Sequence, residues 1–554
     1  MTLLTSCEKD LNLHPLDVIS EETFFVTAND YKLYANNFYF ILPELGTISD
    51  QGDLTIGNGY NEIANGTWVA PESDGTWNSL YDVNRRILIA FDKYEALEDE
   101  SVIEEAKPYI AEMKFFLAMK YLEGLVKFGG VPIVMEVLDL DSEGLYAPRN
   151  TREEVMAYII TLLEEAIADL PQQDELEAAD NGRVTKSAAQ ALLARAALFE
   201  GTWSKFHDKG DGKEYLQLAK NMALAVINSK QYELWDYRDE MDDDSYRFGF
   251  ILQGNAQTNP ANLTLADNKE YILIRRRDQL VSPGGSWTAA LFGEYHMSPT
   301  KKYADMFLCD DGLPIDRSGR FLGYDEPTFE YQNRDPRMKQ VLIEPFTRYW
   351  SNNLGPLNRD WANPTENGVI YEVEIGTRTR TGYLQKKFKQ EINGDAFSFP
   401  VIRLAEIYLI YAEATFELDE SISDSDLDLS INKLRDRVGM PKLSNAFVTG
   451  NGLDMQTEIR RERNIELFME TNRRDDLRRW KVAEDEMIKP VKGITWEGTY
   501  YETTEPWSNI SADLGEDGAI IIEDGREFKP KHYLFPIPLR QIILNPALEQ
   551  NPGW

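Results

Sequence analysis

The sequence has few of the residues that usually build metal sites or disulfide frameworks. Among its 554 residues are two cysteines and four histidines. Cys7 and Cys309 form no CxxC pair, so neither a disulfide framework nor a zinc site is indicated. The histidines show no HExxH motif and no paired spacing. We therefore expect no metal-dependent catalysis and no dedicated metal site, and incidental calcium binding by an Asp-rich loop such as Asp310-Asp311 stays open.

Positive charge and long apolar runs are also scarce. Lysine and arginine number 58 against 94 aspartates and glutamates, which gives a net charge of −36. A field of that sign disfavours nucleic acid and anionic membrane surfaces as direct ligands, although local arginines can reverse it. No run approaches the roughly 20 apolar residues that a membrane-spanning helix needs. No GxSxG, Walker or GxGxxG element occurs in a supporting context.

Amphipathic helical patterns account for most of the first 230 residues. They cover residues 22–43, 77–97, 102–128, 151–170, 185–199 and 213–229, and they resume at 402–418 and 427–437. A capping box at 151–154 and the Gly129-Gly130 stop mark two of the boundaries. Successive pairs have roughly the length of tetratricopeptide units, but a regular 34-residue consensus is missing. We therefore predict packed helix pairs without regular repeats.

Between these helical regions the chain is rich in glycine, proline, asparagine and aspartate. The main irregular segments are residues 46–76, 231–400 and 490–530. A compact domain rarely carries so long an irregular segment unless the segment has a function. The chain also has 11 tryptophans and 27 tyrosines, and several lie in these segments. We therefore look for a binding surface there.

Residues 456–481 (QTEIRRERNIELFMETNRRDDLRRWK) concentrate charge of both signs. Glu458, Glu462, Glu466 and Glu470 recur every four residues, and seven arginines are interleaved with them. On a helix these glutamates form one column, which nearby arginines can neutralise. We predict a structural helix held by an arginine–carboxylate network and partly inside the fold. The alternative, a basic nucleic-acid helix, is disfavoured by the six acidic residues mixed in.

The N-terminus carries a candidate lipidation site. Leu4-Thr5-Ser6-Cys7 has the order of a bacterial lipoprotein cleavage box, in which a cysteine thiol takes a diacylglycerol. Only six residues precede Cys7, so we expect part of the signal peptide to be missing from this sequence. Residues 8–15 are polar and are typical of a tether. An ordinary cysteine near a frayed terminus is the alternative.

Several short motifs, taken in order, resemble the SusD/RagB family of outer-membrane nutrient-binding lipoproteins. These motifs are 77–81 (WNSLY), 128–132 (FGGVP), 182–186 (GRVTK), 310–314 (DDGLP), 335–337 (DPR), 403–413 (RLAEIYLIYAE), 462–467 (ERNIEL), 476–480 (DLRRW), 535–538 (FPIP) and 550–554 (QNPGW). Each is weak alone, but together they extend from Cys7 to Trp554 in the family's order.

The resemblance implies a mainly α fold, in which a tetratricopeptide-like helix-pair scaffold (an α–α superhelix) carries a large loop-rich insertion. Residues 1–20 would be the lipoprotein N-terminus and tether, and residues 21–554 a single domain. Within that domain, residues 21–230 and 400–481 would form the scaffold, and residues 231–399 and 482–554 the loop-rich segments.

The resemblance also implies a function. The protein would be anchored in the outer membrane by lipid on Cys7 and displayed at the cell surface. It would capture oligosaccharide and deliver it to a TonB-dependent, SusC-like barrel, without catalytic residues or cofactors. Three alternatives stay open: a peptide-binding member of the same family, a glycoside hydrolase whose carboxylate pair only a structure can identify, and a helical scaffold that binds only a protein.

Flat aromatic side chains are the expected contacts for a sugar, because a pyranose ring presents C–H groups on one side. Tryptophan and tyrosine add a hydrogen-bonding tip to that flat surface. By analogy with the family, we expect the site to draw on the first loop and on the irregular middle of the chain. The candidates are Tyr60, Trp68, Trp287, Tyr295, Trp350 and Trp361. Trp77 and Trp480 lie on helical patterns and are expected in the core, and Trp554 should hold the C-terminus against the body.

Overall fold

The computed structural model describes residues 24–44, 52–57, 59–241, 245–251, 261, 263–277, 297–351, 368–373, 375, 379–389, 398–470 and 473–554. Of residues 348–351 and 368–370 it describes the backbone alone. Cys7, Trp287, Tyr295 and Trp361 lie outside the described residues. The predicted mainly α fold is confirmed: helices dominate, and the strands are short and paired in twos.

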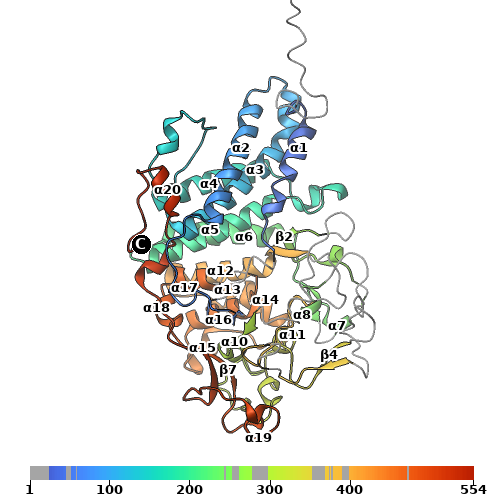
Figure 1. Cartoon of the computed structure of the whole chain (residues 1–554). Helices are drawn as coiled ribbons and strands as arrows, with labels where there is room; N and C mark the ends of the chain where they lie inside the picture. The colour runs from blue at the N-terminus through green and yellow to red at the C-terminus, as the bar shows by residue number, and fades with distance from the viewer. Residues whose placement is uncertain are drawn as a thin grey trace, which may run out of the picture.

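Five long helices form the part of the molecule that lies at the top of Figure 1 together with the short helix α1. Each long helix packs against the next one along the chain, and α1 packs against α3. The pairing expected from the sequence is thereby confirmed. The helices are α1 (Ala28–Asn36), α2 (Gly75–Glu95), α3 (Glu100–Phe128), α4 (Arg152–Asp169), α5 (Lys186–Phe206) and α6 (Lys213–Ser229).

Local sequence signals fix the ends of these helices. Thr151 caps α4 in a full capping box with Glu154, and Asp74 caps α2 by accepting from the amides of Thr76 and Trp77. Helix α3 ends at Gly129, whose φ of +80° is open to glycine at little cost. The predicted boundaries of α2, α3, α4 and α6 therefore agree with the structure to within a few residues. Helix α1 is shorter than the predicted 22–43, and α5 continues past the predicted end at 199 to Phe206.

Small residues let α5 and α6 approach closely. Six alanines of α5 are buried, as the alanine-rich pattern predicts. At the turn into α6, Gly212 has a φ of +65°, and a Cβ placed there would lie 2.0 Å from the carbonyl oxygen of Gly201. The two backbones are in direct contact at this turn, and only glycine fits there. Helix α12 (Leu404–Asp419) then packs on both α5 and α6, so the later helical segment rejoins the scaffold.

The remaining elements are short and lie mostly in the lower part of Figure 1. Short helices are α7 (Arg238–Met241), α8 (Ser245–Phe248), α10 (Lys301–Met306), α11 (Arg337–Val341), α13 (Asp424–Leu429), α14 (Ile431–Asp436), α15 (Asn445–Gly450), α16 (Met455–Glu466), α17 (Arg473–Arg479), α18 (Ala483–Glu486), α19 (Tyr500–Thr503) and α20 (Leu539–Leu544). The antiparallel strand pairs are β1 (Thr55–Ile56) with β3 (Ser298–Pro299), β2 (Tyr271–Arg275) with β6 (Phe399–Arg403), β4 (Arg348–Ser351) with β5 (Gly368–Ile370), and β7 (Val491–Thr495) with β8 (Ala519–Glu523).

The prediction of one helix over residues 456–481 needs a correction. The segment forms two helices, α16 and α17, because the chain leaves α-helical geometry after Glu466 and Met469 adopts a φ of +62°. The break lets the glutamate column enter the core while the later arginines turn toward the C-terminal segment, where Arg478 Nε donates to the carbonyl of Tyr533 at 2.7 Å.

The predicted arginine–carboxylate network is confirmed, but its cations come mostly from elsewhere in the chain. Glu466 lies 2.6 Å from a guanidinium nitrogen of Arg403, 2.6 Å from one of Arg437 and 3.0 Å from one of Arg337. Burial alone would raise the pKa of Glu466, but these three guanidinium groups outweigh burial and hold its pKa well below the ordinary value. The network thus joins β6, α11, α16 and the end of α14.

The C-terminus folds back onto the helical part. Trp554 donates from Nε1 to the carbonyls of Lys531 and Leu534, each at 3.0 Å. Asn551 donates to the carbonyl of Phe128 at the end of α3. The expected role of Trp554 is confirmed. Across the described ranges, no helix is both long and apolar enough to cross a bilayer.

Candidate ligand-binding site

Of the six predicted aromatic residues, Tyr60 stands clearly at the surface. Its side chain is 65% exposed, and its hydroxyl lies 2.9 Å from Oγ1 of Thr67. The loop that carries it is tied to the rest of the loop-rich part through Arg380, which donates to the carbonyl of Gly57 at 2.8 Å. Tyr60 is therefore an open ring held on an anchored loop.

Trp68 is placed differently from the expectation. Its side chain is only 8% exposed. The ring packs against Phe535 with centroids 4.4 Å apart, and against His532 and Trp554 at 5.3 and 5.4 Å. An indole enclosed in this way offers no open face to a sugar. Trp68 instead helps to hold the C-terminal segment and is not part of the binding surface.

The other four candidates cannot be grouped around Tyr60. Trp350 lies on β4, where the backbone alone is described, and Trp287, Tyr295 and Trp361 lie outside the described residues. Trp77 and Trp480 are buried, which confirms the expectation that they belong to the core. The predicted arc therefore stays a prediction at these four positions.

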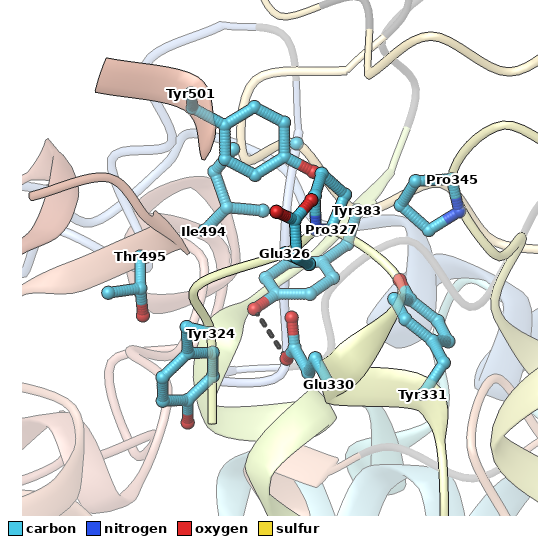
Figure 2. Close-up of a pocket in the computed structure, with 11 residues that line it drawn as sticks. Tyr324, Glu326, Pro327, Glu330, Tyr331, Pro345, Tyr383, Ile494, Thr495 and Tyr501 are labelled. Atoms are coloured by element: carbon cyan, nitrogen blue, oxygen red, sulfur yellow. Dashed lines mark hydrogen bonds between the residues drawn. The ribbon is translucent and has the colours of Figure 1, made fainter. Parts of the chain in front are cut away.

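A pocket lined by tyrosines lies in the loop-rich part, and sequence reasoning missed it (Figure 2). We call it the tyrosine pocket, and its lining comes from four separate stretches of chain. The lining residues are Tyr324, Glu326, Pro327, Glu330, Tyr331, Pro345, Gly382, Tyr383, Ile494, Thr495 and Tyr501. Its free volume is only about 10 Å³, so it admits a water-sized group and not a sugar ring.

A buried tyrosine and a buried glutamate form a hydrogen bond in the tyrosine pocket. Tyr383 donates from its hydroxyl to Oε1 of Glu330 at 2.8 Å, the contact drawn as a dashed line in Figure 2. Burial raises the pKa of the Glu330 carboxyl, and burial followed by the nearby Glu330 raises the pKa of Tyr383 well above its ordinary value. The tyrosine hydroxyl therefore stays protonated and remains a donor.

A group of aromatic rings, of which Phe346 is the exposed member, adjoins this pocket. We call Phe346, Tyr500 and Trp507 the aromatic rim. The ring of Phe346 lies 5.8 Å from that of Tyr500 and 6.2 Å from that of Trp507, and Tyr501 of the pocket lies 5.6 Å from Trp507. Phe346 is 38% exposed and lies two residues before β4, which carries Trp350. Trp507 is only 6% exposed and supports Phe346 from inside, so Phe346 is the ring of the rim that lies open next to hydroxyl and carboxyl groups.

Sequence reasoning missed the pocket and the rim because their residues are scattered over about 180 positions. One usable signal was present: four aromatic residues crowd the irregular stretch after α18, which are Trp496, Tyr500, Tyr501 and Trp507. Which earlier segment they meet depends on long-range hydrogen bonds such as that from the amide of Tyr500 to the carbonyl of Asp325 at 2.8 Å.

Within the part of the chain that the structure describes, no three histidine, cysteine, aspartate or glutamate side chains are grouped to hold a metal ion. Cys309, a described cysteine, is buried, and burial raises the pKa of its thiol. The arrangement is suited to stacking and hydrogen bonding.

Comparison with known protein families accounts for most of the chain. Residues 253–554 match the model described as "SusD family", and residues 45–198 match one described as "Starch-binding associating with outer membrane". The first match alone covers more than half of the sequence. The chain belongs to the SusD family. The resemblance inferred from the motifs is thereby confirmed.

Curated SusD-like relatives match nearly end to end. A SusD-like protein of Bacteroides ovatus is 22% identical over 86% of this chain and 80% of its own length. SusD-like protein P25 of Formosa agariphila is also 22% identical, over 99% of this chain and 95% of its own length.

Solved SusD-like structures share the fold. A SusD-like protein of Bacteroides fragilis has a TM-score of 0.73 at 21% identity and covers 98% of this chain and 100% of its own. A second B. fragilis structure, described as a SusD-like carbohydrate-binding protein, has a TM-score of 0.70 at 21% identity, over 95% of this chain and 100% of its own. A protein described as a laminarin-binding SusD-like protein has a TM-score of 0.59 at 18% identity, over 95% and 99%.

Proposed function

We propose that this protein is a cell-surface glycan-binding protein that captures oligosaccharide without cleaving it. The observation that carries this proposal is membership of the SusD family together with exposed aromatic rings on its loop-rich part. Support also comes from a structural neighbour described as carbohydrate-binding and another described as laminarin-binding. The ligand surface comprises Tyr60 and the exposed Phe346 of the aromatic rim, and it extends to Trp287, Tyr295, Trp350 and Trp361.

The described part of this surface has the two features that sugar binding needs. Tyr60 and Phe346 present ring faces to solvent, and C–H groups of a pyranose pack on such faces. Glu326 is exposed at the edge of the tyrosine pocket and can accept hydrogen bonds from sugar hydroxyls. The Tyr60 loop is held by the hydrogen bond from Arg380 to the carbonyl of Gly57, and Phe346 by the hydrogen bond from its amide to the carbonyl of Tyr371 at 2.7 Å. This anchoring limits the entropy lost on binding.

We further propose that the protein is held at the outer membrane by lipid on Cys7 and hands its ligand to a TonB-dependent, SusC-like barrel. Support comes from the Leu4–Cys7 box and from the family description "associating with outer membrane". Covalent lipid anchors a chain by burying acyl CH₂ groups, at about 0.8 kcal/mol each. In this arrangement the described residues need no membrane-spanning helix of their own.

The test is a glycan array on the purified chain lacking Cys7, followed by calorimetry with the glycans that bind. Tyr60→Ala and Phe346→Ala should each weaken binding by roughly 5- to 30-fold, since one stacking contact is worth about 1–2 kcal/mol. Tyr146→Ala is the matched control, because Tyr146 is a 58% exposed tyrosine of the 3-10 helix η4 (Glu143–Tyr146), away from the loop-rich part. It should bind like the wild type.

Two results would contradict the proposal. The first is failure to bind any glycan on the array, with binding to peptides or to a protein alone pointing to one of the alternatives. The second is release of shortened products during prolonged incubation, measured by chromatography, which would indicate a hydrolase.

A further inference from the structure

A groove of about 430 Å³ lies between α10, α16, α18 and β7. We call it the charged groove. Helix α10 contacts both α16 and β7, so the groove is built on packed elements. Its volume lies within the range of small-ligand sites. It is also some forty times larger than the tyrosine pocket. The two are linked by a hydrogen bond, in which Lys301 of the groove donates to the hydroxyl of Tyr324 of the pocket at 2.6 Å.

The charge of this groove is opposite to that of the whole chain. Its lining includes six cationic side chains, which are Lys301, Lys302, Arg461, Lys489, Lys492 and Arg526. It includes four carboxylates, which are Asp53, Asp305, Glu486 and Asp517. The lining therefore carries two positive charges in excess, in a protein with 94 acidic and 58 basic residues. Such a local reversal of sign focuses the field on anions.

Each of the four carboxylates already has a cationic partner. Asp305 is 2.9 Å from Lys301, Asp517 is 2.9 Å from Lys492, and Glu486 is 2.7 Å from Lys489. Asp53 is 2.9 Å from Arg473, a buried arginine outside the lining, and also pairs with Lys302. The carboxylates of the groove are thus neutralised without using Arg461.

Arg461 keeps donors available for a ligand. Its Nε lies 3.3 Å from Oε1 of Glu458, and its two terminal nitrogens have no hydrogen-bond partner within the described ranges. The side chain lines the groove and is 18% exposed, so it is neither buried in protein nor fully in water. A guanidinium edge of this kind presents two parallel N–H donors, which match the two oxygens of a carboxylate or sulfate.

We propose that the charged groove is a second ligand site, which takes the carboxylate or sulfate group of an acidic glycan on Arg461. Lys489 and Lys302 lie on the same lining, where their pairing with Glu486 and Asp53 keeps these carboxylates from repelling the bound anion. This inference rests on the proposed function, because it names the class of glycan. It assigns to the chain acidic oligosaccharides, which its net charge of −36 would otherwise repel.

The experiment measures calorimetric affinities of the chain lacking Cys7 for three probes at 50 and 300 mM NaCl. The carboxylate probe is trigalacturonate, the sulfate probe is a neocarrageenan tetrasaccharide, and the neutral reference is trigalacturonate with all carboxyls methyl-esterified. We expect one of the two acidic probes to bind at least about 10-fold more tightly than the neutral one, as one charge-assisted contact allows. This preference should shrink at the higher salt concentration.

Variants locate the effect. Arg461→Gln should remove most of the preference for the acidic probe, and Arg461→Lys should keep part of it, because charge remains but the guanidinium fork is lost. Lys489→Gln, at a 57% exposed side chain, should reduce the preference by a few-fold and carries the test if Arg461→Gln fails to fold. Arg317→Gln is the matched control, at a 52% exposed arginine outside the groove lining, and should change nothing.

The possible failures are distinguishable. If neutral glycans on the array bind but neither acidic probe does, this inference is wrong and the proposed function stands. If no glycan of any kind binds, the proposed function fails as well. Acidic binding that is equal in the wild type, Arg461→Gln and Lys489→Gln proteins would place the anion elsewhere and overturn the assignment of the groove.

Discussion

The long helices α2 to α6 and the later part of the chain bury different kinds of side chain. In α2 to α6 the core is made mainly of alanine, leucine, isoleucine and aromatic rings. Arginines dominate the largest fully buried side chains of the described residues, and all six of them lie later in the chain. They are Arg247, Arg337, Arg403, Arg435, Arg478 and Arg479. In the later part of the chain, where most helices are short, buried guanidinium groups join distant segments.

This difference shows how an irregular chain can keep a fixed surface. A loop has no ladder of its own to satisfy its carbonyls, and each buried arginine supplies several donors at once. Arg334, for example, donates to the carbonyls of Ala304, Phe307 and Glu330. The loops that carry the aromatic rim and the tyrosine pocket are therefore anchored on their buried side, while their outer faces stay open to solvent.

The largest expected effect comes from breaking the arginine network. Arg403→Met removes the contacts to Glu270 and Glu466, each at 2.6 Å, and leaves buried carboxylates short of a cation. We expect a loss of about 3–5 kcal/mol in the free energy of unfolding, measured by urea denaturation. Lys442→Ala, which breaks an exposed pair with Asp428, is the control and should leave the free energy of unfolding nearly unchanged.

Equal losses in these two variants would contradict the comparison. They would mean that Arg437 and Arg337 neutralise Glu466 without Arg403. The buried ion pairs of Arg403 would then not stabilise this part of the fold.

The next effect tests the close packing of the helical part. Gly212→Ala places a Cβ 2.0 Å from the Gly201 carbonyl oxygen at a left-handed φ, so α5 and α6 must separate. The strained backbone alone costs about 1–3 kcal/mol, and we expect at least that loss on thermal or urea unfolding. Gly75→Ala, with open space around its Cα and an ordinary φ, should be close to neutral.

The pH dependence of stability should come first from two histidines near the C-terminal segment. Burial is the main cause that lowers the pKa of His207 and of His532 to about 4. A histidine with a lowered folded pKa is uncharged in the fold but protonated in the unfolded chain below about pH 6.5. Stability should therefore fall as the pH drops from about 6.5 to 4.

The expected size is up to about 2 kcal/mol per histidine between pH 6.5 and 5, at 1.36 kcal/mol for each pH unit. The check is urea denaturation at both pH values for the wild type and for His207→Gln. The substitution retains a donor for the carbonyl of Arg478, which lies 2.8 Å from Nε2 of His207, and it removes the titrating group. An unchanged pH dependence in this variant would exclude His207 as a source.

The smallest effect concerns the tyrosine pocket. Tyr383→Phe removes the donor to Glu330 but keeps the buried ring, so we expect a loss of about 1 kcal/mol, measured by urea denaturation, with little change in glycan affinity. Calorimetric titration of Tyr383→Phe and of Phe346→Ala with the same glycan distinguishes a structural role from ligand contact. A large loss of affinity in Tyr383→Phe would instead place the ligand inside the pocket.

The sequence alone was sufficient for the scaffold because its signals are local. Capping residues, the Gly129-Gly130 stop and the alanine-rich face of α5 each act within one or two turns, so helix pairs and their order were predictable. The break after Glu466 was not, since it depends on guanidinium groups from β6, α11 and the end of α14 meeting that side chain. No periodicity in residues 456–481 encodes those partners.

The candidate site was less predictable for the same reason. Aromatic residues in loops look alike in the sequence, yet Tyr60 stands open while Trp68, eight residues later, is enclosed by Phe535, His532 and Trp554. The difference arises because the C-terminal segment returns across the end of α3, a contact made between residues more than 400 positions apart. Composition indicated which part of the chain to search, but only long-range packing decides which rings face solvent.

Hydrogen–deuterium exchange with a saturating bound glycan tests the central claim most directly. If the loop-rich part is the binding surface, protection should rise in peptides covering residues 55–67, 320–331, 345–351 and 496–510, while α2 to α6 keep their exchange rates. Protection confined to the helices, with the peptides around Tyr60 and Phe346 unchanged, would contradict the account.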